Sequence, residues 1–133
     1  MKKILIINAN YYKDISKNLI KCAKETLHNY QFKTSIINVP GIYEIPITLI
    51  KYIKKFDGFV VLGCVIKGET PHFNFISTSA TDAIMKLSIN HKKPIGNGII
   101  TCLNKEQAVK RSKTKGKEAA AAVYDILLKF KYD

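Results

Sequence analysis

Gly68 and His72 belong to a ten-residue stretch, 63–72, in which turn-forming and proton-exchanging residues follow an apolar run. Gly68 lets the backbone turn, and Pro71 fixes a dihedral angle suited to the first turn of a helix. Free amides at a helix start bind anions, and histidine exchanges a proton near neutral pH. The stretch therefore predicts chemistry on a phosphorylated small molecule, unless His72 is only a helix cap or a surface residue.

Arg111 is the only arginine in a chain that has 22 lysines and arginines and a net charge of +12. Its planar guanidinium pairs with phosphate or carboxylate through two hydrogen bonds, which lysine cannot do. The lysines are spread over every segment, so we interpret most of them as a solvated surface rather than a nucleic-acid interface.

The length of 133 residues fits a single domain, 1–133, with a sizeable core. No apolar stretch is long enough to cross a bilayer, and the apolar run after Met1 is too short for a signal peptide. These features favour a cytoplasmic protein. Cys22, Cys64 and Cys102 have no metal-ligand spacing, which argues against zinc and structural disulfides and favours reduced thiols in small apolar gaps.

Short apolar strands alternate with amphipathic helices along the whole chain. We expect strands at 3–8, 34–39, 59–64 and 95–101, and helices from about 16, at 46–55, at 73–89, from 104 to about 111 and at 117–130. This alternation predicts an α/β three-layer sandwich with a four-stranded parallel sheet, flavodoxin-like in type.

Ligands of such sheets bind beyond the carboxyl ends of the strands. The residues at those ends, in 8–12, 40–44, 64–72 and from 101 onward, are rich in aromatic, polar and glycine residues. Tyr11 either packs under a loop or stacks on a planar ligand, and Glu44 either complements a helix dipole or binds a polar heterocycle. Gly96 and Gly98 predict close approach of a ligand or another backbone. Because these features converge on one rim, His72 becomes a candidate catalyst.

Four motifs, in this order, resemble the lumazine synthase family over nearly the whole chain. They are Pro40-Gly41-Ile42-Tyr43-Glu44-Ile45-Pro46, the stretch 62–72, the segment 94–101 with Gln107-Ala108-Val109-Lys110-Arg111, and Lys115-Gly116 before an alanine-rich helix. The resemblance implies condensation of 5-amino-6-(D-ribitylamino)uracil with 3,4-dihydroxy-2-butanone 4-phosphate, without metal or organic cofactor. This condensation requires a site that orients two substrates, binds an anion and shuttles a proton.

The resemblance also assigns roles by position. His72 would move protons, Tyr11 would stack on the pyrimidine, and the phosphate would meet Gly68, Glu69 and Thr70. The remaining aminouracil contacts would come from Ile42, Tyr43, Glu44, Cys64, Val65 and Ile66. A neighbouring subunit would supply Asn97, Arg111 and Lys115, because the family's site lies between subunits of a pentamer.

Several positions depart from the family pattern. Asn10-Tyr11-Tyr12 stands where Arg-Phe-Asn is frequent, so a positive charge is lost, and Asn97 replaces a frequent aromatic. The segment between Arg111 and Lys115 is shorter than usual, and the family's extra amino-terminal strand is absent. These differences favour a homo-oligomer that is a pentamer or decamer over a larger capsid.

Three other interpretations stay open at this point. An archaeal-type riboflavin synthase is related to the family, although the Gly68-Glu69-Thr70-Pro71-His72 stretch favours lumazine synthase. A non-enzymatic phosphate- or nucleic-acid-binding module would show binding that weakens steeply with salt. A flavodoxin-like electron carrier would need an acidic surface and a Ser/Thr-rich loop after the first strand, and neither is present.

Overall fold

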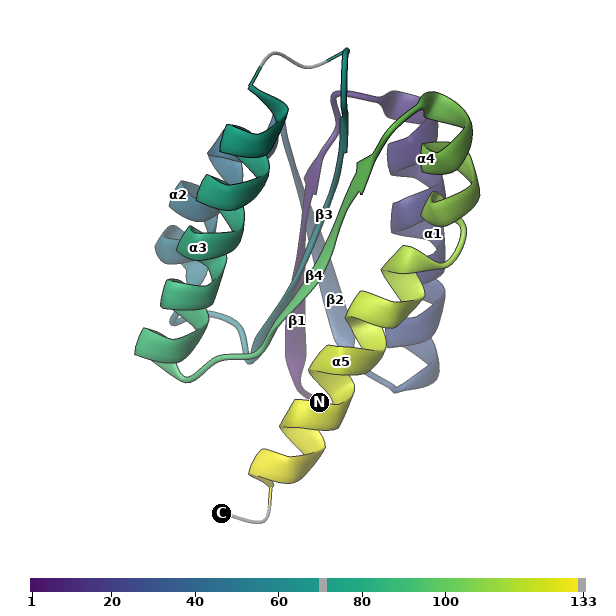
Figure 1. Ribbon diagram of the computed structural model, residues 1–133. Coiled ribbons are helices and arrows are strands. Elements are labelled where there is room, and N and C mark those ends of the chain that lie inside the picture. The colour runs from purple at the N-terminus through teal and green to yellow at the C-terminus, as the bar shows by residue number, and fades with distance from the viewer. Residues whose placement is uncertain (70–71, 132–133) are drawn as a thin grey trace.

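The computed structural model describes residues 1–69 and 72–131. Strands and helices alternate along these ranges as the sequence predicts (Figure 1). The strands are β1 (Lys3–Ala9), β2 (Lys33–Val39), β3 (Gly58–Ile66) and β4 (Ile95–Cys102). The helices are α1 (Lys13–Asn29), α2 (Ile45–Tyr52), α3 (Phe73–His91), α4 (Lys105–Ser112) and α5 (Lys115–Phe130), and a short 3-10 helix, η1 (Ile42–Glu44), precedes α2.

The strands form one parallel sheet in the order β2-β1-β3-β4. Helices α2 and α3 cover one face, and α1, α4 and α5 cover the other, with the sheet between them (Figure 1). Parallel strands need crossover connections, and the helices that supply them must lie on the faces of the sheet. The predicted flavodoxin-like α/β sandwich is confirmed.

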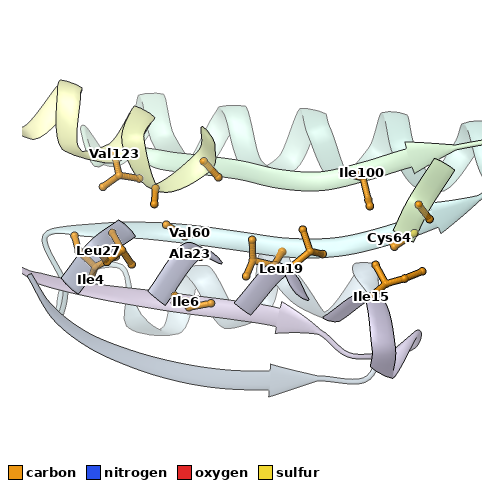
Figure 2. Packing of buried hydrophobic residues seen from close by; sticks show 14 of the residues in the cluster. Ile4, Ile6, Ile15, Leu19, Ala23, Leu27, Val60, Cys64, Ile100 and Val123 are labelled. Atoms are coloured by element: carbon orange, nitrogen blue, oxygen red, sulfur yellow. The ribbon is translucent and has the colours of Figure 1, made fainter. Parts of the chain in front are cut away.

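Alternating side chains divide the core into two layers. Ile4 and Ile6 of β1 pack toward α1 and α5 (Figure 2), whereas Leu5 and Ile7 belong to the layer that packs toward α2. Strand β3 lies in the middle of the sheet, and all nine of its residues are buried. Because each fully buried Ile or Leu side chain contributes about 1.5–3 kcal/mol, these central strands form a rigid base for the loops at their carboxyl ends.

Helix α5 lies unusually close to β4. A Cβ atom on Gly96 would collide with the backbone carbonyl of Ala119, and one on Gly98 would lie 2.5 Å from Leu62 Cδ2. Of the two predicted causes for these glycines, close approach of another backbone is therefore correct at Gly96. The contact fixes α5, and with it the short turn from α4, against the outer strand of the sheet.

Several predicted boundaries are wrong by two or three residues. Helix α1 begins at Lys13 instead of about 16, α2 ends at Tyr52 instead of 55, and β3 continues to Ile66. Helix α5 begins at Lys115 and includes Gly116, which was assigned to the preceding turn. A side chain at Gly116 would collide with the carbonyl of Leu19, so this glycine serves helix packing, which propensity alone cannot reveal.

We expect Gly96→Ala to destabilise the fold by at least ~2 kcal/mol, because the added methyl group meets backbone that cannot rotate away. Urea unfolding monitored by circular dichroism measures this change. Ser35→Ala, at an exposed position of strand β2, is the control and should unfold like the wild type. A Gly96→Ala midpoint equal to that of the control would contradict the close packing of α5 on β4.

Candidate functional site

A pocket of about 310 Å³ opens at the carboxyl ends of β1 and β3, beside η1 and the start of α3. Seven residues singled out from the sequence line it together: Tyr11, Ile42, Tyr43, Glu44, Cys64, Val65 and His72. Gly41 and Ile76 complete the lining. Its walls are mostly apolar, with a carboxylate, a phenol and an imidazole at the edge, as expected of a site for a planar polar ring.

The 3-10 helix η1 positions the middle of this pocket. Its first residue, Ile42, is buried, and Gly63 on β3 leaves the space that the Ile42 side chain fills. Tyr43 and Glu44 then face outward at the amino end of α2, where Pro46 occupies the first turn as predicted. The Pro40-Gly41 turn therefore brings an aromatic and an acidic side chain to the mouth of the pocket.

His72 is the N-cap residue of α3, but its side chain makes no capping hydrogen bond. Its carbonyl accepts the first helical hydrogen bond from Ile76 N–H at 2.9 Å. The backbone at His72 has a φ of 62°, in the left-handed region that non-glycine residues rarely occupy. Such strain concentrates at functional sites, and His72 is one of the residues that line the pocket.

Tyr11 is 71 % exposed and lies edge-on to Tyr12, with ring centroids 5.0 Å apart. Of the two interpretations from the sequence, packing under a loop does not describe Tyr11, because most of its ring faces solvent at the pocket rim. An exposed ring held by an aromatic neighbour is a suitable stacking surface for a planar ligand.

The loop after β3 turns at Gly68, whose φ is +88°, a conformation that favours glycine. The Lys67 N–H donates to the Cys102 carbonyl at 2.9 Å, and the Glu69 N–H donates to the Ile66 carbonyl at 3.2 Å. These bonds tie the start of the loop to the ends of β3 and β4. Thr70, a predicted phosphate contact, and Pro71 lie outside the described residues.

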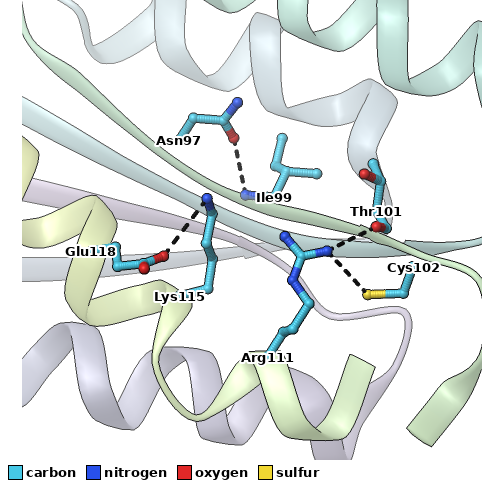
Figure 3. A network of polar contacts seen from close by, with 7 residues as sticks. All are labelled: Asn97, Ile99, Thr101, Cys102, Arg111, Lys115 and Glu118. Carbon is cyan, nitrogen blue, oxygen red and sulfur yellow. Dashed lines mark hydrogen bonds and ion pairs between the residues drawn. The ribbon is translucent and has the colours of Figure 1, made fainter. Parts of the chain in front are cut away.

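The three residues that the sequence assigned to a neighbouring subunit lie apart from the pocket, along the outer edge of β4. Figure 3 shows Asn97 on the strand itself and Arg111 and Lys115 reaching toward it from α4 and α5. Asn97 Oδ1 accepts a hydrogen bond from Ile99 N–H at 3.0 Å. Asn97 also lines a separate hollow of about 410 Å³ between β4 and α3, together with Ser77, Thr78 and Thr81.

Helix α4 places Arg111 at this edge. The Asn104 side chain caps α4 as predicted, accepting from Gln107 N–H at 2.9 Å, and Gln107 Oε1 accepts from Leu103 N–H at 3.0 Å. This reciprocal capping fixes where the helix starts. Two turns later, Arg111 Nη1 donates to the Thr101 carbonyl at 3.0 Å. Within the described part of the chain, Lys115 forms only a long ion pair with Glu118, at 3.9 Å, so its ammonium group can engage an anion.

Two comparisons with known proteins identify the family of this chain. The family model described as 6,7-dimethyl-8-ribityllumazine synthase matches residues 1–131. The chain belongs to the lumazine synthase family. A lumazine synthase of Bartonella tribocorum is 39% identical over 97% of this chain and 91% of its own length. Those of Agrobacterium fabrum and Campylobacter jejuni are also 39% identical, over 93% and 94% of this chain and 91% and 87% of their own lengths.

The thiol of Cys64 is buried at the wall of the pocket. Its pKa is raised to about 12, mainly by burial and to a smaller extent by Cys102 and Glu69, while Arg111 acts in the opposite direction. The thiol therefore stays protonated at neutral pH and is a poor nucleophile. Cys64 contributes to the pocket wall by its position at the end of β3 rather than by covalent chemistry.

Sequence reasoning missed two features of the candidate site. Gly63 makes room for Ile42, and Cys102 contacts the guanidinium of Arg111, with Sγ 3.7 Å from Nη1. Period-two alternation along β4 could have placed Cys102 on the side of α4, but its distance to Arg111 depends on where α4 begins. Within the described ranges, no cluster of three or more His, Cys, Asp or Glu side chains could hold a metal ion.

We expect Cys64 to resist alkylation by iodoacetamide at pH 9 in the folded protein. Because its pKa lies near 12, only about a thousandth of the thiol is ionised at that pH, and its side chain is 8 % exposed. Site-resolved mass spectrometry measures the labelling rate, with the less buried Cys22 as internal control. Equal rates at Cys64 and Cys22 before unfolding would contradict the buried, protonated thiol.

Proposed function

We propose that this chain is a 6,7-dimethyl-8-ribityllumazine synthase of riboflavin biosynthesis. The reaction joins 5-amino-6-(D-ribitylamino)uracil to 3,4-dihydroxy-2-butanone 4-phosphate and releases phosphate and water. The observation that carries the proposal is the family match over residues 1–131, combined with a pocket lined by seven of the residues expected to bind or act on the substrates.

The pocket at the ends of β1 and β3 suits the aminouracil. The exposed ring of Tyr11 stacks on the pyrimidine, while backbone groups of Cys64, Val65 and Ile66 hydrogen-bond its edge. The ribityl chain runs along η1, past Ile42, Tyr43 and Glu44. Stacking together with backbone hydrogen bonds fixes the ring plane, so the amino group that attacks the ketone is oriented before reaction.

His72 is the proton shuttle. Imine formation, loss of phosphate, ring closure and dehydration each move a proton, and imidazole both donates and accepts near neutral pH. The imidazole makes no capping bond to its own helix and lines the pocket, so it can face the reacting atoms.

The phosphate lies between the loop at Gly68, Glu69 and Thr70 and the cations Arg111 and Lys115. The Glu69 carboxylate repels an anion, and the backbone N–H of Glu69 already donates a hydrogen bond to the Ile66 carbonyl. The guanidinium of Arg111 offsets the acidic charge of Glu69 beside the phosphate.

Arg111, Lys115 and Asn97 of one chain complete the site of the next chain in a homo-oligomer. These residues lie on the open edge of β4, outside the pocket that contains His72. Exposed apolar side chains on α2 and α3, among them Ile47, Phe75 and Ile89, provide surface for contacts between chains. The assembly is a pentamer or a decamer, formed by the single domain 1–133.

Two competing functions are less well supported. The matching family model and the three relatives carry the name of lumazine synthase, not of archaeal-type riboflavin synthase. A nucleic-acid-binding module would need its basic residues gathered on one surface, whereas the lysines are distributed along the whole sequence. Across residues 1–69 and 72–131, none of the helices has the length and apolar character of a membrane span. We propose that the enzyme acts in the cytoplasm.

We expect His72→Ala to slow lumazine formation by roughly tenfold to a thousandfold with the fold intact, because a positioned acid or base supplies about that much. The assay follows the absorbance and fluorescence of the product. His91→Ala, at the other end of the same helix, is the control and should keep the wild-type rate. A wild-type rate in His72→Ala would remove the histidine from the mechanism.

Arg111→Lys should raise the KM for the butanone phosphate by roughly tenfold and change the KM for the aminouracil by less than about twofold. The reason is that lysine keeps the charge but loses the two-pronged contact with phosphate. Lys110→Ala, exposed on the same helix, is the matched control. Equal increases in both KM values would contradict a phosphate-specific role.

A further inference from the structure

Arg111 is anchored to β4 through a single nitrogen. Nη1 lies 3.0 Å from the Thr101 carbonyl oxygen and 3.7 Å from Cys102 Sγ (Figure 3). The other terminal nitrogen points away from both acceptors. An exposed arginine would otherwise lose considerable rotamer entropy on binding a ligand, so two acceptors that hold one arm lower that cost.

Cys102 connects the arginine to the loop that follows β3. Its carbonyl accepts the Lys67 N–H at 2.9 Å, and because bonding directions alternate along a strand, the carbonyl of Thr101 points to the outer edge. The Cys102 side chain is 2 % exposed and cannot move without disturbing the core. Its sulfur therefore has a fixed position and contacts the guanidinium of Arg111.

Other roles for this thiol fit the geometry poorly. Cys64 pairs with Ile100 and Cys102 pairs with Ile66, so the two cysteines are diagonal neighbours with Cα atoms about 7–8 Å apart, too far for a disulfide. A soft metal cation bound to either sulfur would be repelled by the positive charge of the neighbouring Arg111. Burial also keeps Cys102 from acting as an external nucleophile.

We propose that Cys102 is a positioning residue for the phosphate clamp: its sulfur and the Thr101 carbonyl hold one arm of Arg111 so that the other arm faces the substrate phosphate. Sulfur is a weak acceptor, so it orients the guanidinium without neutralising the charge that the phosphate needs. A carboxylate in its place would compete with the phosphate. The inference rests on the proposed function, because it assigns the anion to that same site.

The test compares Cys102→Val, which removes the acceptor and adds one methyl group to the space of the sulfur, with Cys102→Ser, which keeps an acceptor. We expect Cys102→Val to raise the KM for the butanone phosphate by ~3- to 10-fold, with kcat and the KM for the aminouracil within about twofold of wild type. The KM of Cys102→Ser for the butanone phosphate should fall between those of the wild type and Cys102→Val. In an Arg111→Ala background, Cys102→Val should add nothing, because the two residues act as a unit.

A second readout needs no catalysis. Binding of inorganic phosphate, measured by calorimetry on the assembled protein, should weaken by ~3- to 10-fold in Cys102→Val relative to wild type and by more than that in Arg111→Ala, which loses the whole guanidinium. If the wild type binds phosphate in this way but forms no lumazine, the proposed reaction fails and the positioning role stands. Three results would overturn the positioning role. They are an unchanged KM in Cys102→Val, additive effects of Cys102→Val and Arg111→Ala, and phosphate binding that is as strong in Arg111→Ala as in the wild type.

Discussion

The close contact between α5 and β4 determines where the cationic site residues Arg111 and Lys115 lie. Because Gly96 has no side chain, the backbone of α5 rests directly on the strand, and Gly116 allows the start of α5 to approach α1 in the same way. Because α4 ends just before α5 begins, these two contacts also hold the carboxyl end of α4 against the outer edge of the sheet. Arg111 and Lys115 are thereby fixed on that edge, more firmly than exposed cations on a free helix would be.

The parallel sheet separates two kinds of site residue. On the side of α2 and α3, the ends of β1 and β3 form a pocket with stacking, backbone and imidazole groups. On the outer edge of β4, Asn97 Oδ1 accepts from the Ile99 amide and Arg111 donates to the Thr101 carbonyl, so two backbone groups of this edge are already bonded to side chains. In the proposed assembly, the edge meets the next chain through side chains, and each pocket receives its phosphate cations from a neighbour.

Much of the architecture follows from local pattern, because burial on both faces makes the strands apolar throughout and amphipathic helices reveal their inner face. The pocket residues were predictable because parallel strands bring their carboxyl ends to one rim. The interpretation of Gly96 and Gly116 needed the packing of α5, and the Cys102–Arg111 contact needed the capping of α4. Sequence spacing does not determine such distances between elements, and the roles of His72 and Arg111 stay predictions.

Mixed oligomers of His72→Ala and Arg111→Ala chains test most directly whether each site is shared by two subunits. In the proposed ring, each site takes its histidine from one chain and its arginine from the next, so equal random mixing should restore about a quarter of the wild-type sites. Each variant alone should keep at most about a tenth of the wild-type activity. If the mixture, prepared by co-expression and measured by lumazine formation, is no more active than the average of the two variants, the shared site is contradicted.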